Sequence, residues 1–344
     1  MSENTYSEVE NVITKYDLKV KKITPETLKE KKAVWWIDSA SQKFILKRMP
    51  LPKDRFLFLL SAIRHLRNNG IHLPEIYQAR DGDCLVEAKE RMYILMEAIT
   101  GKVPDYNVPR EMALIMQEMA RFHQASRNFV PPQPARIRQH LGTWEKRYSE
   151  TVMQLEAFKK TALLNPAQEF AKGYLADCDY FIKEASDCLE ALRHSGYADW
   201  VAKVRREVNL CHQDFAAGNL GLVNGEIYVY DLDSITFDLP ARDLRKIMNK
   251  VMKKRGAWDL SLTREMLQSY QAIMPLSRDE YDVLFTDLRF PHLFYGITSK
   301  YFDNRNGEWS PAKHLSKLKD IIKIEKSKSV VLNNKHNILD SIGL

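Results

Sequence analysis

Residues 212–219 read His-Gln-Asp-Phe-Ala-Ala-Gly-Asn and lie in a short segment between long stretches of helical pattern. Phosphoryl transfer requires a carboxylate that orients the acceptor hydroxyl, a metal ion that offsets phosphate charge, and a cation beside the nucleotide phosphates. The spacing from Asp214 to Asn219 matches the catalytic loop of protein kinases, in which the Asp faces the acceptor and the Asn binds metal. We therefore predict that Asp214 is catalytic and that Asn219 is a metal ligand. His212 belongs to the same catalytic set, where we interpret it as a brace for the loop rather than as a base.

A predicted β-hairpin follows this loop. Two apolar runs, residues 220–223 and 226–230, are joined by Asn224-Gly225, a strong signal for a tight turn. The second run ends in Asp231, which would lie beside the preceding loop, where hard oxygen ligands suit magnesium bridging the phosphates. Asp233, two residues further along an extended strand, points the same way and can assist the metal or the acceptor site. Both carboxylates therefore join the predicted metal site.

Each of these residues also has an ordinary structural explanation. Asp and Asn are favoured in turns, and a histidine in a loop often only satisfies backbone carbonyl groups. The combination favours the functional interpretation, because the residues occur in the required order with a hairpin of suitable length between Asn219 and Asp231.

The first hundred residues have the pattern of a small antiparallel sheet with one helix. Short β-prone runs at 33–38 and 43–47 flank a polar turn and predict a hairpin. Apolar residues at helical spacing follow Pro52 and predict a helix. Runs at 84–88 and 92–96 complete the sheet. Strand, strand, helix, strand, strand is the order of the small lobe of a kinase.

The pattern changes from period two to period 3.6 after the last of these strands, at a connector that begins with Glu97 and Ala98. The remainder is mostly helical, with long helical patterns at 143–195 and a basic amphipathic pattern at 313–328. We therefore predict an α+β, bilobal, protein kinase-like fold. Its expected parts are residues 1–98 as a nucleotide-binding β-sheet lobe, 99–328 as a helical lobe with the catalytic loop and metal strand, and 329–344 as a polar C-terminal tail.

Lys47 is the predicted cation for the nucleotide phosphates. It ends an apolar run, and a lysine that faces inward from the third strand of a kinase small lobe reaches the α- and β-phosphates. An ordinary surface lysine is the rival interpretation, and Lys43 and Arg48 are close enough to compete for the role. We expect the backbone of Glu97 and Ala98 to meet the adenine edge, because connectors between lobes offer free carbonyl and amide groups.

Composition excludes several other classes of protein. Of the 344 residues, 44% are hydrophobic, which is enough for a sizeable core, and the longest strongly apolar run, residues 56–60, is far shorter than the roughly 20 residues of a membrane-spanning helix. The first residues show no secretory signal, and the four cysteines form no Cys-x-x-Cys pair. The net charge of +7 comes with no nucleic-acid-binding motif. We expect cytoplasmic synthesis, no membrane insertion and no nucleic acid partner.

Three motifs resemble the superfamily of aminoglycoside phosphotransferases and choline kinases: residues 212–219, Val-Tyr-Asp-Leu-Asp at 229–233, and Pro-Ala-Arg-Asp-Leu at 240–244. Within that superfamily, the chain is similar to the CotS-type spore coat proteins of endospore-forming bacteria. Further stretches carry this narrower resemblance, namely 44–48, 120–126, 141–144 and 288–291. The resemblance covers nearly the whole chain, about residues 10–325.

The resemblance implies a small-molecule kinase that uses ATP and Mg²⁺, with Asp214 as catalytic base and Asn219 and Asp231 as metal ligands. It also implies that Asp243 braces the catalytic loop. The partners would be the nucleotide, a small-molecule acceptor with a hydroxyl or amine group, and other spore coat proteins. Such a protein would be made in the mother cell and deposited in the spore coat.

Two departures from an ordinary kinase leave a second hypothesis open. No glycine occurs before Gly70, so a glycine-rich phosphate loop is missing. Residues 52–69 contain no glutamate that could pair with Lys47, and the only acidic residue there, Asp54, lies at the wrong end. The two hypotheses are an active ATP-dependent phosphotransferase and a catalytically degenerate, kinase-shaped scaffold of the spore coat.

A basic segment lies at residues 242–255, directly after the predicted metal strand. A solvated helix face is the simpler interpretation, and an electropositive approach to the acceptor site for a phosphorylated or polyanionic substrate is the sharper one. Aromatic residues of the helical lobe, among them Trp144, Tyr148 and Phe290, can form core or line a pocket for a cationic acceptor. We expect them to form core.

Overall fold

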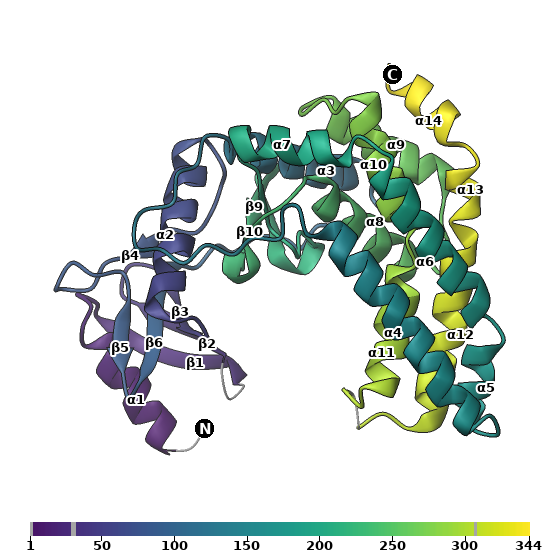
Figure 1. Ribbon diagram of the computed structural model, residues 1–344. Helices are drawn as coiled ribbons and strands as arrows, with labels where there is room; N and C mark the ends of the chain where they lie inside the picture. The colour runs from purple at the N-terminus through teal and green to yellow at the C-terminus, as the bar shows by residue number, and fades with distance from the viewer. Residues whose placement is uncertain (1–2, 29–31, 306–307) are drawn as a thin grey trace. The chain divides into compact units, whose positions relative to one another are not determined.

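The computed structural model describes residues 3–28, 32–305 and 308–344, which form two compact units (Figure 1). The sheet unit takes in the chain up to Val103 together with Val130–Ile137 and Gly218–Asp233. The helical unit consists of Pro104–Phe129, Arg138–Ala217 and Ser234–Leu344. The predicted α+β class is confirmed, because an antiparallel sheet near the N-terminus is followed by a mostly helical remainder.

Five strands of the sheet follow the order β1-β2-β3-β6-β4, and β5 also pairs with β6. The predicted first hairpin is confirmed, because β2 and β3 pair with Trp35 opposite Leu46. Side chains on β2 alternate between buried and partly exposed, as a strand with one face on the core requires. The strands span Val20–Leu28 (β1), Ala33–Ser39 (β2), Lys43–Met49 (β3), Ile76–Tyr77 (β4), Val86–Ala88 (β5) and Arg91–Glu97 (β6).

Two helices accompany the sheet. The helix predicted after Pro52 is confirmed as α2, Lys53–Asn68, whose buried stripe includes Phe56, Leu59 and Ile63. The other helix, α1, Glu3–Ile13, was not expected from the sequence; it contacts β5, and its buried valines join the core of the sheet unit (Figure 1).

The hairpin after the catalytic loop is also confirmed. β8, Leu220–Val223, pairs with β9, Glu226–Val229, and the two turn residues have positive φ angles of 52° and 88°, as a tight two-residue turn requires. The hairpin belongs to the sheet unit, where Leu222 forms an isolated bridge with Lys102.

The helical unit consists of α3 to α14 and a short ladder of β7 and β10. Helix formation predicted for 143–195 is confirmed, with α4 and α6 packed side by side (Figure 1). No helix in the described part of the chain is both long enough and apolar enough to cross a membrane. The elements span Pro109–Ala125 (α3), Trp144–Leu164 (α4), Glu169–Leu175 (α5), Cys178–Arg193 (α6), Tyr197–Glu207 (α7), Leu210–Cys211 (β7), Thr236–Phe237 (β10), Ala241–Arg255 (α8), Leu260–Gln271 (α9), Arg278–Arg289 (α10), His292–Phe302 (α11) and Pro311–Ser327 (α12).

Residues 329–344 form packed helices instead of the loose polar tail that was expected. They contain α13, Ser329–Leu332, and α14, Lys335–Ser341. Val331, Ile338 and Leu339 are almost completely buried. The expectation fails because these few apolar residues recur at helical spacing, so even a mostly polar segment presents one apolar stripe to the helical unit.

Candidate active site

The predicted catalytic loop follows β7 and is held by Asp243 from the first turn of α8. The buried carboxylate of Asp243 accepts hydrogen bonds from the backbone N–H groups of His212 (2.6 Å) and Gln213 (2.8 Å). Gln213 has a positive φ of 75°, so these bonds stabilise a backbone conformation that residues with a side chain rarely adopt. Asp243 thus forms the brace that the family resemblance implies.

A buried histidine supports this brace. Nε2 of His123 lies 3.3 Å from Asp243, and its Nδ1 lies 2.8 Å from the hydroxyl of Tyr270. Burial by itself would raise the pKa of Asp243, but the hydrogen bond and charge of His123 outweigh burial and hold that pKa below its usual value. Cys211 lies close enough to suggest a metal site. However, its thiol donates to the carbonyl of Leu239 and the other ligand atoms have hydrogen-bond partners, so we interpret the group as a structural cluster.

His212 and Asp214 occupy contrasting environments on the loop. His212 is fully buried beside the rings of Phe122 and Phe215, and its Nδ1 accepts a hydrogen bond from the backbone N–H of Asp214 (3.2 Å). This environment is that of a brace, in agreement with its interpretation. The side chain of Asp214 is 58% exposed, and Nζ of Lys250 lies 3.2 Å from its carboxylate. The Asp214 carboxylate is therefore accessible to a dissolved acceptor.

A cluster of two lysines and two aspartates lies in the sheet unit. Nζ of Lys47 lies 2.6 Å from a carboxylate oxygen of Asp231 and 2.6 Å from one of Asp233. Nζ of Lys32 lies 2.8 Å from Asp231 and 3.2 Å from Asp233. Burial raises the pKa of Asp231, but the charges and hydrogen bonds of the two lysines reverse that effect and hold its pKa well below its usual range.

The backbone of the hairpin places these carboxylates. Asp231 follows β9 with a positive φ of 53°, and Asp233 lies in a short 3₁₀ turn, Leu232–Ser234. The expectation that Asp233 continues an extended strand is wrong, because β9 ends at Val229 and Asp233 lies in the 3₁₀ turn that follows. The turn nevertheless brings both carboxylates to Lys47.

Asn219 begins the same hairpin. The backbone N–H of Tyr230 donates to its carbonyl oxygen (2.8 Å), so the predicted ligand Asn219 and the segment that carries Asp231 are adjacent. Asp214 belongs to the helical unit, and its convergence with Asn219 and Asp231 on one metal ion stays a prediction.

The donor set in the sheet unit fits a hard divalent cation. Oδ2 of Asp233 is buried and accepts no hydrogen bond of suitable geometry, although Nζ of Lys32 is 3.2 Å away. Carboxylate oxygens are the ligands that Mg²⁺ prefers. Asp231 and Asp233 would therefore supply carboxylate ligands to such an ion.

The family model described as "Spore coat putative kinase YutH" matches residues 10–335. The chain belongs to the YutH family. Spore coat protein S of Bacillus subtilis (strain 168) is 31% identical to it over 325 residues, which cover 94% of this chain and 93% of the relative. The resemblance to CotS-type spore coat proteins is thereby confirmed.

Solved structures similar to this YutH-family chain include small-molecule kinases. An aminoglycoside phosphotransferase from Alicyclobacillus acidocaldarius has a TM-score of 0.81 at 17% identity, with 96% of each chain covered. An amicoumacin kinase in complex with AMP-PNP and Ca²⁺ has a TM-score of 0.65 at 16% identity, with 95% of this chain and 96% of that chain covered. Likeness at such low identity shows the fold alone, and it confirms the predicted kinase-like fold.

The YutH-family chain gives Lys47 a different partner from the one an ordinary kinase uses. Helix α2 offers no acidic partner, because Asp54 at its start lies 3.2 Å from Arg136. Asp231 and Asp233 take that role in the structure. Lys47 is therefore a buried, doubly paired cation and not a mobile surface lysine.

The connector of the YutH-family chain differs from one expectation. The backbone N–H of Glu97 donates to the carbonyl of Glu75 (2.8 Å), and that of Ala98 lies 3.4 Å from the carbonyl of Lys43. The expectation of free amide groups is wrong, because the sheet continues up to the connector. Recognition of adenine by the backbone of Glu97 and Ala98 stays a prediction.

Lys32 is the site residue that the sequence analysis of this YutH-family chain missed. It directly precedes β2, at the end of the connection from β1. Kinases place their glycine-rich phosphate loop between the first strands. The signal that could have identified Lys32 is the position of a lysine in that connection, but it depends on recognising β1 first.

Proposed function

We propose that the chain is an ATP- and Mg²⁺-dependent phosphotransferase that acts on the hydroxyl or amine group of a small molecule. The observation that supports this most is the cluster in which Lys47 contacts both Asp231 and Asp233. Phosphate binding requires a cation and Mg²⁺ binding requires oxygen ligands, and this cluster brings a lysine and two carboxylates together. Nucleotide and divalent metal are also present in the complex of the similar amicoumacin kinase.

Each residue has a defined role in this proposal. Lys47 and Lys32 contact the nucleotide phosphates, and Asp231, Asp233 and Asn219 hold Mg²⁺, which supplies positive charge that offsets the charge of the phosphates. Asp214 orients the acceptor and takes up its proton, while His212 fixes the backbone of the loop.

In this proposal the γ-phosphoryl group of ATP passes to the acceptor in one step. The acceptor oxygen or nitrogen forms a bond to the γ-phosphorus, and the bond from that phosphorus to the β,γ-bridging oxygen breaks. ADP leaves with the electron pair of the broken bond, and the acceptor proton passes to the carboxylate of Asp214.

A coat scaffold without activity is the second candidate function. It is favoured by the absence of an acidic residue on α2 that could pair with Lys47. In either case we place the protein in the spore coat, after synthesis in the mother cell and in contact with other coat proteins, because the family and its relative are spore coat proteins. Recovery of the protein outside the coat fraction of purified spores would contradict this location.

Substitution of Asp214 tests the enzymatic proposal. Asp214→Asn keeps the side-chain volume and removes the proton acceptor, so ADP formation by the purified full chain with Mg²⁺ and ATP should fall by about 100-fold or more. Asp320→Asn is the matched control, because Asp320 is also 58% exposed and has a lysine, Lys317, at 3.3 Å. Equal rates in the unmodified chain and in Asp214→Asn would contradict the proposal.

A further inference from the structure

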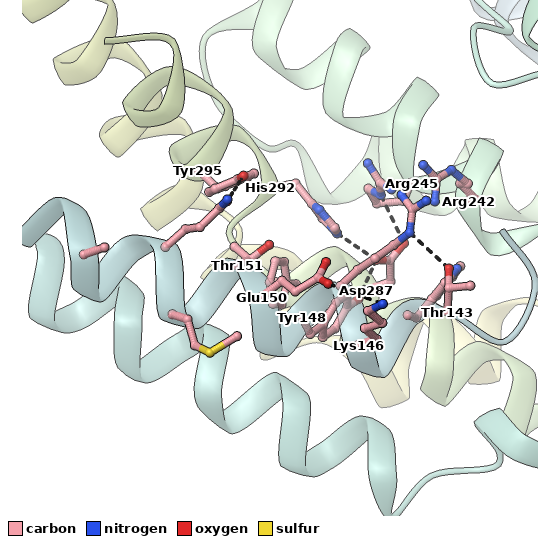
Figure 2. A pocket seen from close by; sticks show the side chains of 16 residues that line it. Thr143, Lys146, Tyr148, Glu150, Thr151, Arg242, Arg245, Asp287, His292 and Tyr295 are labelled. Atoms are coloured by element: carbon pink, nitrogen blue, oxygen red, sulfur yellow. Dashed lines mark hydrogen bonds and ion pairs between the residues drawn. The ribbon is translucent and has the colours of Figure 1, made fainter. Parts of the chain in front are cut away.

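The helical unit contains a cavity of about 910 Å³, which we call the acceptor cavity. One wall is formed by Thr143 and by residues of α4 as far as Ala157. The other walls are Arg242 and Arg245 of α8 and the segment from Asp287 to Tyr295. In Figure 2 the side chains of Arg242 and Arg245 lie together at one end of the cavity, and Tyr295 lies toward the other.

Positive charge dominates the lining. Four cationic side chains face the cavity with only two carboxylates, those of Glu150 and Asp287. Nε of Arg245 donates to Asp287 (3.0 Å), and Arg242 pairs with Asp238 (3.1 Å), which is fully buried. A guanidinium has five N–H donors, so one or two such bonds leave most of its donors for another acceptor.

Arg147 has no carboxylate partner among the described residues. Its Nε donates to the hydroxyl of Thr143 (3.0 Å), and the remainder of the exposed guanidinium borders the cavity. Burial, and then the positive charge of Arg242, lower the pKa of Arg147, in agreement with the place of both guanidinium groups in the lining of one cavity.

The positive charges near the cavity also affect a neighbouring histidine. His140 belongs to the helical unit, and its Nδ1 is buried without a hydrogen-bond partner among the described residues. Burial and the charges of Arg242, Arg147, Arg138 and Lys246 lower the pKa of His140 to about 3. Burial is the larger cause, but the four positive charges act in the same direction, and these charges would attract an anion.

Helix α8 connects the acceptor cavity to the catalytic loop. Nε of Arg242 donates to the side-chain oxygen of Gln213 (2.7 Å), the residue before Asp214. Further along the helix, Lys250 contacts Asp214 itself. An acceptor whose anionic group lies in the cavity would thus be bound by the same helix that contacts the proposed catalytic carboxylate.

Three of the aromatic residues that line the cavity are too buried to form a cage for a cation. Trp144, Tyr148 and Phe290 are each at most 3% exposed, in agreement with the expectation that they are core. Tyr148 stacks on Phe290 with ring centroids 3.8 Å apart, and its hydroxyl donates to Asp287. A cation–π site needs an accessible ring face, and these rings do not offer one.

We propose that the acceptor cavity binds a phosphate or carboxylate group through Arg147, Arg242 and Arg245, so that the acceptor of the reaction is an anionic hydroxyl compound such as a sugar phosphate or a sugar acid. Arginine forks match both anions in geometry and charge. The assignment of this anion as a phosphoryl acceptor rests on the proposed function, whereas the binding of the anion does not.

Calorimetry with the full chain, without ATP or metal, tests the binding step. Glucose 6-phosphate and glucuronate are compared with glucose, which has the same ring without the anionic group, and choline represents a cationic acceptor. We expect at least one of the two anions to bind about tenfold or more tightly than glucose, and its affinity to fall as salt is raised. Anion affinities no higher than those of glucose or choline would overturn the proposal.

Substitutions of Arg147 test whether the anion binds in the acceptor cavity. Arg147→Gln should weaken binding of the preferred anion by about tenfold, and Arg147→Glu should abolish it. The matched control is Arg206→Gln on α7, because Arg206 is also exposed and without a carboxylate partner among the described residues. Equal affinity in the unmodified chain and in Arg147→Glu would show that the anion binds elsewhere and would overturn the assignment.

Different results would contradict the phosphotransferase and the anionic acceptor. Anion binding at Arg147 without ATP turnover would leave the acceptor cavity as an anion site and contradict the phosphotransferase. Turnover of ATP with glucose or choline as acceptor, without preference for the anionic compounds, would leave the phosphotransferase and overturn the anionic acceptor.

Discussion

In the proposed phosphotransferase, the charge of Lys32 takes the place of the glycine-rich loop that this chain lacks. Backbone N–H groups of such a loop bind phosphate oxygens in other kinases, and the ammonium of Lys32 offers three donors from the same connection between strands. Burial lowers the pKa of Lys32, but Asp231 and Asp233 outweigh burial and raise it above its usual value, so Lys32 is a cation at neutral pH.

We predict that Lys32→Met weakens binding of Mg²⁺-ATP by about tenfold, because one of two cations beside the phosphates is lost. Titration calorimetry measures this dissociation constant. Lys43→Met is the control, because Lys43 is exposed and its nearest carboxylate, Asp38, is 3.7 Å away. Tighter binding in Lys32→Met would instead mean that Lys32 competes with the metal for Asp231 and Asp233, and would contradict the role proposed here.

The proposed metal site depends on the hairpin of β8 and β9, and Gly221 leaves the space in which the ring of Tyr230 packs against that hairpin. A Cβ atom at Gly221 would lie 1.7 Å from the hydroxyl oxygen of Tyr230 and 2.7 Å from the ring carbon that bears it. Tyr230 directly precedes Asp231, so the ring that needs this space belongs to the segment that carries the metal ligand.

We predict that Gly221→Ala lowers the free energy of unfolding by about 1–3 kcal/mol, because the methyl group forces Tyr230 and its neighbours to move. Urea denaturation measures the loss, and Mg²⁺-ATP binding should weaken with it. Gly296→Ala is the control, because nothing lies within 4 Å of a Cβ at that helical position. A neutral result for Gly221→Ala would show that Tyr230 is not held against the hairpin.

Elements that are marked by residue types at fixed spacing could be predicted from the sequence, whereas elements without such a pattern could not. The loop at 212–219 and the turn at Asn224 depend on residue types at fixed spacing; the turn is confirmed, and the catalytic role of the loop stays a prediction. Strand β1 was missed because it is an edge strand with mostly exposed residues, a proline and two register shifts, which leaves no period-two pattern. The role of Lys32 was missed with it.

The other features that the sequence did not predict depend on side chains that are far apart in the sequence and meet only in the folded chain. The acceptor cavity needs α4, α8 and the junction of α10 with α11, and no spacing rule brings Arg147 to Arg242. The turn that contains Asp233 directly follows Asp231, whose positive φ no spacing rule predicts. The basic pattern of 242–255 was visible, but its contact with the catalytic loop through Gln213 was not.

At the scale of the whole molecule, the residues proposed for nucleotide binding and for catalysis belong to different compact units. Lys47, Asp231 and Asp233 lie in the sheet unit, and Asp214 lies in the helical unit. Substitutions in the two units should therefore separate binding from turnover. Stabilisation by ATP also distinguishes an active kinase from a scaffold, because a scaffold without a nucleotide site gains no stability from ATP.

We predict that Mg²⁺-ATP at about 100 times its dissociation constant stabilises the full chain by about 2.7 kcal/mol, because only the folded chain binds it. Asp214→Asn should keep this stabilisation while it loses turnover, and Lys47→Met should lose both. Thermal and urea unfolding with and without Mg²⁺-ATP measure the effect, and EDTA should reduce it if Asp231 and Asp233 hold the metal. No stabilisation of the unmodified chain would favour the scaffold, and full stabilisation of Lys47→Met would show that the nucleotide does not contact Lys47.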